Sequence, residues 1–148
     1  MPTPHPRLAR ALLRCGGIAS VLLMVFHLFL GRILGWEEGL QVLSPIDRAT
    51  MITFNTVVTG VLLYFAYLTF VRTEAFLQSA LGRSVAKGIA GFFLLRALCQ
   101  PLVYGAIDLR GAVIIASMVL FAALYLLPLA LTRPMRAPSK GHEHARSA

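Results

Sequence analysis

The sequence predicts an all-α integral membrane protein, specifically a four-transmembrane-helix antiparallel bundle with both termini in the cytoplasm. The first observation is composition: 57% of the 148 residues are hydrophobic and only 14% are charged, against about 45–50% and about 25% in soluble domains. The second is that the apolar residues fall into four runs of the length a membrane helix needs, about 20 residues. The third is that arginine and lysine flank these runs unevenly. A chain this short cannot bury so many apolar side chains in one soluble core.

The first span is expected at about 15–34. Arg7, Arg10 and Arg14 precede it, as basic residues precede the apolar core of a signal peptide. No A-x-A cleavage pattern follows, so an uncleaved membrane helix is favoured over a cleaved signal peptide. Residues 1–14 are then expected to form a basic cytoplasmic tail.

The second span is expected at about 50–71, and a strong signal for the start of a helix precedes it. Ser44 can cap the helix, Pro45 suits its first position, and Asp47 places a carboxylate near its N-terminus. The third span is expected at about 84–107.

The fourth span is expected at about 111–131 and is the most uniformly apolar. Pro134 and Pro138 follow it, and residues 132–148 are predicted to form a disordered, basic cytoplasmic tail. The connections between spans are short, which makes consecutive helices antiparallel neighbours.

The distribution of basic residues predicts the orientation of these spans. Ten arginines and lysines flank the spans on the side that holds both termini, and three lie on the other side. The positive-inside rule therefore places the termini in the cytoplasm. The net charge of +8 is explained by this topology rather than by nucleic-acid binding. Because arginine outnumbers lysine 12 to 2, we expect a multi-pass protein of a bacterial inner membrane.

Arg96 is the most informative polar residue, because it lies well inside the third span. It is 12 positions from the start of that span, about 18 Å deep at 1.5 Å per residue. A cation at such depth is costly, so it should face protein or water and have partners. Gln100 and Tyr104 follow at four-residue spacing and extend one polar stripe.

Polar residues of the first two spans fall at a similar depth. His27 lies 12 residues into the first span, and Asn55 lies five residues below the outer edge of the second. Pro101 lacks an N–H group and so frees the carbonyl of Ala97 at this level. The candidate ligand-binding residues are therefore His27, Asn55, Arg96, Gln100 and Tyr104, in the outer half of the membrane.

Three functions are compatible with this set. The first is binding of the polar head of a lipophilic molecule, such as a membrane lipid or a quinone, with Arg96 as the charged donor. The second is a non-catalytic accessory subunit of a larger membrane protein, with homo-oligomers also open. The third is a membrane enzyme that uses His27 as acid or base and Arg96 to bind an anion, although no nucleophile or metal site is evident. A purely structural hydrogen-bond network remains open beside all three.

The sequence predicts no cofactor, no metal site and no nucleic-acid partner. A bis-histidine haem needs two intramembrane histidines, and only His27 qualifies. In helix count and helix length across residues 15–131, the layout resembles the DoxX-like proteins and the ergosterol-biosynthesis scaffold proteins. That resemblance implies a four-helix membrane fold and no particular activity.

Overall fold

The computed structural model describes residues 5–105 and 108–132, and in these the chain is helical throughout, with no strand. Four helices are long and apolar enough to cross a membrane. They are α1 (Pro6–Ile33), α3 (Pro45–Val71), α5 (Ala80–Tyr104) and α6 (Leu109–Leu131). Three short helices connect them: α2 (Trp36–Gly39), η1 (Leu40–Val42) and α4 (Thr73–Gln78). The predicted all-helical class with four membrane-length helices is confirmed.

Helix α1 begins earlier than its apolar run. Its first residue is Pro6, which needs no N–H partner at that position. Residues 6–14, expected to belong to a tail, are therefore helical, since arginine, leucine and alanine all favour the helix. Of the expected C-terminal tail 132–148, all but the first residue lies outside the described part.

Three of the long helices begin at a side-chain cap. The Ser44 hydroxyl accepts a hydrogen bond from the backbone N–H of Asp47 at 3.2 Å and donates one to its carboxylate at 2.7 Å. Ser79 caps α5 and Asp108 caps α6 in the same way, by accepting from a backbone N–H three residues later. Each cap satisfies a donor that the first helical turn leaves free.

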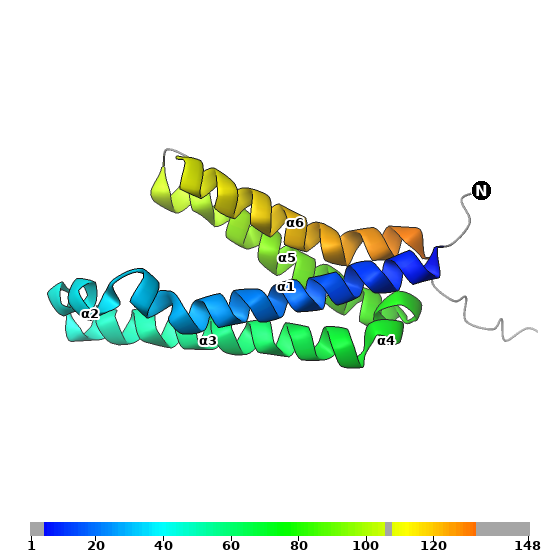
Figure 1. Cartoon of the computed structure of the whole chain (residues 1–148), viewed down its shortest axis with the longest axis horizontal. Helices are drawn as coiled ribbons and strands as arrows, with labels where there is room; N and C mark the ends of the chain where they lie inside the picture. The colour runs from blue at the N-terminus through cyan, green and yellow to red at the C-terminus, as the bar shows by residue number, and fades with distance from the viewer. Residues whose placement is uncertain (1–4, 106–107, 133–148) are drawn as a thin grey trace, which may run out of the picture.

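The long helices form two arms (Figure 1). Helices α1 and α3 pack along each other as the first arm, and α5 and α6 as the second. The arms meet where α1 packs on α6 and α4 packs on α5, which we name the closed end. They diverge toward α2 and the turn between α5 and α6, which we name the open end. Gly105 makes that turn possible, because its φ of 70° is unfavourable for other residues.

Helix α4 turns back into the closed end. Phe76 and Leu77 are buried, with 2% and 3% of their surfaces exposed. Gly82, in the first turn of α5, allows this close approach. A Cβ atom there would lie 2.0 Å from the carbonyl oxygen of Ala75, so any side chain would collide with the backbone of α4.

Aromatic rings fill the junction between the arms. Phe65 of α3 packs edge-on against Phe92 and Phe93 of α5, with ring centroids 5.3 and 6.2 Å apart. Phe93 also contacts Phe121 and stacks on Tyr125, both from α6. These rings therefore join the two arms.

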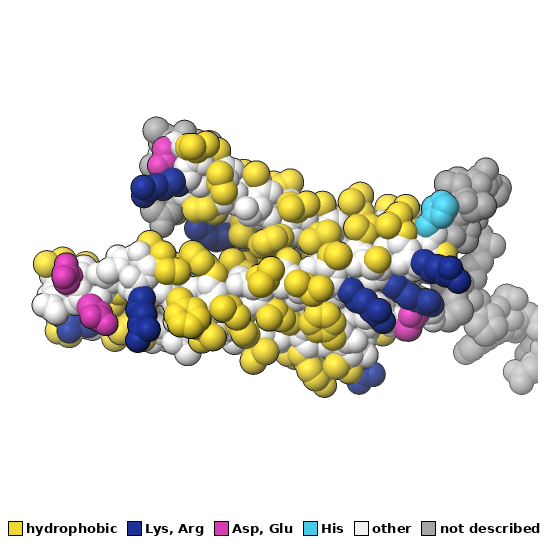
Figure 2. Space-filling view, viewed as in Figure 1, with side chains coloured by type: hydrophobic (Ala, Val, Ile, Leu, Met, Phe, Trp, Pro, Cys, Tyr) yellow, Lys and Arg dark blue, Asp and Glu magenta, His cyan; other side chains and the backbone are white. Residues whose placement is uncertain are grey.

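The outward surfaces of the long helices are apolar (Figure 2). Leu22, Phe54, Leu95 and Leu120 represent the four helices and expose 64%, 67%, 61% and 57% of their surfaces. An apolar surface of this extent needs lipid or protein to cover it.

Candidate functional site

His27 of α1 and Asn55 of α3 form a reciprocal pair. The His27 Nδ1 atom lies 2.8 Å from Asn55 Oδ1, and Asn55 Nδ2 donates to the backbone carbonyl of His27 at 3.0 Å. The sequence placed these residues at similar depth on neighbouring helices, and the structure brings them into contact.

Arg96 and Gln100 form the second pair, one turn apart on α5. The guanidinium donates from Nη1 to Gln100 Oε1 at 2.8 Å. Arg96 is half-buried, and Gln100 is 7% exposed.

Within residues 5–105 and 108–132, no carboxylate neutralises Arg96. The ion pair found in this part of the chain joins Arg10 to Glu74 at the closed end. Two of the acids at the open end, Asp47 and Asp108, are engaged in the caps of α3 and α6. The positive charge of Arg96 therefore has a neutral amide as its partner.

Both pairs keep free hydrogen-bonding atoms. Four atoms make no hydrogen bond to the described residues: Nε2 of His27, Nε and Nη2 of Arg96, and Nε2 of Gln100. No fully buried side-chain nitrogen or oxygen in that part of the chain lacks a partner. These four atoms are therefore at least partly exposed at the protein surface.

The pairs lie at comparable heights above the aromatic junction. On the first arm, Ser20 contacts Tyr125, and His27 follows seven residues later, about 10 Å toward the open end. On the second arm, Phe93 stacks on Tyr125, and Arg96 and Gln100 follow about 5 and about 10 Å further.

Arg96 lies on the side of α5 that faces the first arm. It follows Phe92 and Phe93 by four and three residues, and residues at these spacings share one helix face. Both rings contact Phe65 of α3, which fixes the direction of that face.

The expected cluster of five residues is thus two separate pairs, one on each arm. No hydrogen bond among the described residues joins the His27 pair to the Arg96 pair. Figure 2 shows a wedge-shaped opening between the arms, widening toward the open end. The backbone of Tyr104 ends α5, and its side chain lies outside the described part.

A third polar cluster was not anticipated from the sequence. At its centre is Tyr125 of α6, which is buried against α1 and α3. Its hydroxyl is 3.1 Å from those of Ser20 on α1 and Thr69 on α3, and all three residues are fully buried. Gly16 allows the ring to reach this point, since a Cβ there would lie 3.0 Å from it. A pair of glycines next to Ser20 is the signal that indicates close packing.

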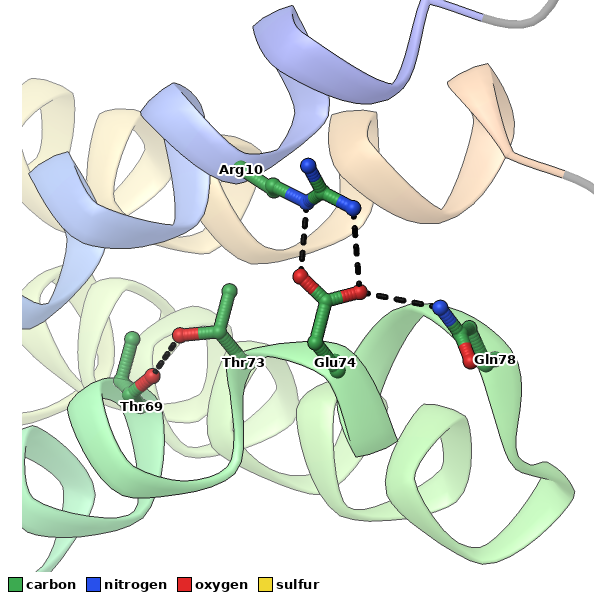
Figure 3. Close-up of polar contacts among 5 residues, drawn as sticks. All are labelled: Arg10, Thr69, Thr73, Glu74 and Gln78. Atoms are coloured by element: carbon green, nitrogen blue, oxygen red, sulfur yellow. Dashed lines mark hydrogen bonds and ion pairs between the residues drawn. The ribbon is translucent and has the colours of Figure 1, made fainter.

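Two arginines hold the closed end together. Arg10 of α1 pairs with Glu74 of α4 at 2.6 Å, and Gln78 donates to the same carboxylate at 2.9 Å (Figure 3). Arg83 donates to the backbone carbonyls of Leu129 and Thr132 at 2.6 and 3.2 Å, which stabilises the C-terminus of α6.

The described residues contain no group of three or more histidine, cysteine or acidic side chains that could hold a metal ion. A shallow groove of about 400 Å³ lies on the surface of α3. At 100° per residue it occupies the face opposite Asn55, so it is separate from both polar pairs. It is lined by Ile46, Ala49, Thr50, Thr53, Phe54 and Val57.

Fold and site together define the class: an all-helical protein with four helices long and apolar enough to cross a membrane, carrying two polar pairs inside those helices. Comparisons with protein-family models, curated proteins and solved structures found no match to this chain.

Proposed function

We propose that this protein is a multi-pass protein of a bacterial inner membrane that binds the polar head of an amphiphile between its two arms. In this proposal the four long helices form an antiparallel bundle with both termini in the cytoplasm. The closed end is cytoplasmic, and the wedge opens toward the periplasm or the outer leaflet. The protein is a binding protein rather than an enzyme.

The charges at the two ends support this orientation. Among the described residues, the closed end carries six basic side chains and one acidic one, whereas the open end carries three basic and four acidic ones. Figure 2 shows acidic side chains gathered mainly at the open end. Positive charge is retained on the cytoplasmic side of membrane proteins. The basic residues of the closed end are Arg7, Arg10, Arg14, Arg72, Arg83 and Lys87.

The unneutralised charge of Arg96 is the observation that carries the binding proposal. A structural network inside a membrane normally pairs a cation with an acid, because an unpaired charge there is costly. Arg96 instead has one amide partner, reachable donors and a position facing the wedge. A ligand oxygen that is anionic or strongly polar would complete its coordination.

The side chains around Arg96 and His27 have separate roles in the proposed site. Gln100 accepts a hydrogen bond from Arg96 and so orients its guanidinium group. Asn55 holds the ring of His27 against α3. Partly buried apolar side chains of the first arm, including Met24 and Val58, suit the hydrocarbon part of the ligand.

Thermal unfolding of the purified protein in detergent, with and without extracted native lipid, tests the proposal. We expect lipid to raise the midpoint temperature of unfolding of the wild-type protein. Arg96→Lys should weaken this response, because lysine keeps the charge but loses the planar fork. Arg96→Leu should abolish it while leaving the protein folded.

Arg32→Leu is the matched control, because it removes an equal charge from the exposed end of α1. It should keep the response to lipid. If Arg96→Leu only stabilises the protein and no lipid shifts the wild type, the polar pairs are structural and the proposal is wrong. Copurification of one larger membrane protein in fixed ratio, without lipid, would instead favour the accessory-subunit function.

A further inference from the structure

The hydrogen-bond directions around His27 can be assigned from chemistry. The backbone carbonyl of His27 can only accept, so the Asn55 atom beside it must be the amide nitrogen. The amide oxygen of Asn55 then faces His27 Nδ1 and can only accept as well. Nδ1 must therefore carry a proton. In the neutral ring, this leaves Nε2 unprotonated, as a hydrogen-bond acceptor.

The two walls of the wedge thus offer complementary groups. The first arm presents an acceptor, His27 Nε2, which has no partner among the described residues and is reachable. The ring is held by Asn55 and by an edge-on contact with Phe26, at a centroid distance of 5.8 Å. On the second arm, the side-chain atoms of Arg96 and Gln100 that have no partner among the described residues are donors.

The opening is still narrow at this height. Met118 of α6 lies seven residues from Tyr125, about 10 Å toward the open end and level with His27. It is only 7% exposed and belongs to the buried core to which both arms contribute. The two polar pairs therefore lie near the narrow part of the wedge.

We propose that the wedge selects an anionic phospholipid whose head group carries a hydroxyl, as in a glycerol ester of the phosphate. Resting on the proposed function, this inference places the phosphate oxygens at Arg96 and Gln100. The hydroxyl donates to His27 Nε2.

The charge of Arg96 favours this head group over zwitterionic ones. A choline or ethanolamine head brings a second cation beside an arginine that has no acid partner in the described chain. A simple anionic phosphodiester satisfies Arg96 but leaves Nε2 without a donor. A head group with a net negative charge and a hydroxyl satisfies both arms without bringing a second cation.

Two lipids of equal charge test the inference. Phosphatidylglycerol and phosphatidylmethanol, with the same acyl chains, are titrated against the purified full-length protein in detergent and quantified by native mass spectrometry. We expect the wild type to bind phosphatidylglycerol roughly five- to tenfold more tightly, the value of one hydrogen bond.

Two substitutions of His27 distinguish the roles of its two ring nitrogens, Nδ1 and Nε2. In His27→Asn the side-chain amide replaces Nδ1 and can still donate to Asn55, but nothing replaces Nε2. We expect this variant to bind both lipids with equal affinity. In His27→Gln the amide reaches the Nε2 position instead, and its oxygen should restore part of the preference. Thr56→Val, on the exposed surface of α3, is the control and should keep the full preference.

The possible outcomes test three separate claims: the hydroxyl selection, the proposed function and the assignment to a phospholipid. Equal affinity of the two lipids for the wild type, or a preference that survives in His27→Asn, overturns the hydroxyl selection and leaves the proposed function standing. Failure of both lipids to bind, with no response to native lipid, overturns both. Tighter binding of a quinol, which also carries a hydroxyl, assigns the site to that class and overturns the phospholipid assignment.

Discussion

His27 and Asn55, 28 residues apart, exchange two hydrogen bonds across the interface of α1 and α3. One of these bonds uses the backbone carbonyl of His27, so it also fixes the register of the two helices. The pair therefore stabilises the first arm as well as presenting the imidazole to the wedge.

Replacing Asn55 with leucine should destabilise the protein by about 0.6–1.7 kcal/mol, the range for hydrogen bonds between membrane helices. Unfolding by SDS titration measures this change. Thr56→Val is the control, because that hydroxyl bonds only to the carbonyl of Ile52 in its own helix. An equal loss in both variants would contradict a role of Asn55 between helices.

The Tyr125 hydroxyl should contribute less than the Tyr125 ring. Ser20 and Thr69 also donate to carbonyls one turn earlier in their own helices, so Tyr125→Phe leaves no donor unsatisfied. We expect Tyr125→Phe to lower the free energy of unfolding by about 1 kcal/mol. Tyr125→Ala also removes the stack on Phe93 and should cost about 3–5 kcal/mol. Similar losses in the two variants would show that the hydroxyl cluster is the main contribution.

Gly82 and Gly88 give a matched pair of glycines on α5. Gly82→Ala should prevent normal folding, because its Cβ would lie 2.0 Å from a backbone oxygen of α4. Gly88 has open space at that position, so Gly88→Ala should raise stability by about 0.5–1 kcal/mol through helix propensity. Size-exclusion chromatography and thermal unfolding in detergent measure both. Normal folding of Gly82→Ala would contradict the packing of α4 described here.

Arg83 should be a strong contributor at the closed end. Its guanidinium donates to carbonyls of Leu77, Leu129 and Thr132, which come from two different helices. Arg83→Leu removes charge-assisted bonds to all three, and we expect a loss of about 1.5–3 kcal/mol in the free energy of unfolding.

The ion pair of Arg10 and Glu74 serves as the comparison for Arg83. The two side chains are 45% and 53% exposed, so solvent screens their attraction. Arg10→Leu should therefore cost less than about 1 kcal/mol. If it destabilises the protein as much as Arg83→Leu, exposure does not govern the strength of these contacts.

The proposed orientation predicts which end of the molecule reagents can reach. In a background with Cys15→Ser and Cys99→Ser, a cysteine at Glu38 should react with a membrane-impermeant maleimide in intact cells. A cysteine at Gln78 should react only after lysis. The reverse pattern would place the closed end outside the cell and overturn the topology.

Residue order was sufficient to predict the all-helical class and the long helices. Four apolar runs predicted four membrane-length helices, and the structure contains them. Ser44, Pro45 and Asp47 marked the start of α3 where the structure has it. Counting residues along the spans placed His27 level with Asn55, and those two side chains meet. The helix predictions succeed because the lengths and starts of helices are one-dimensional properties that residue order sets directly.

Tertiary packing, in contrast, arranges the helices beside one another in a way that residue order does not indicate. It separated the polar residues into two pairs on diverging arms, buried Tyr125 between Ser20 and Thr69, and turned α4 into the core. The hydropathy of a membrane helix does not indicate which face contacts protein, since lipid tails accept apolar side chains as well as a neighbouring helix does. Close packing decides the faces instead, through contacts such as Gly16 against the ring of Tyr125 and Gly82 against the backbone of α4.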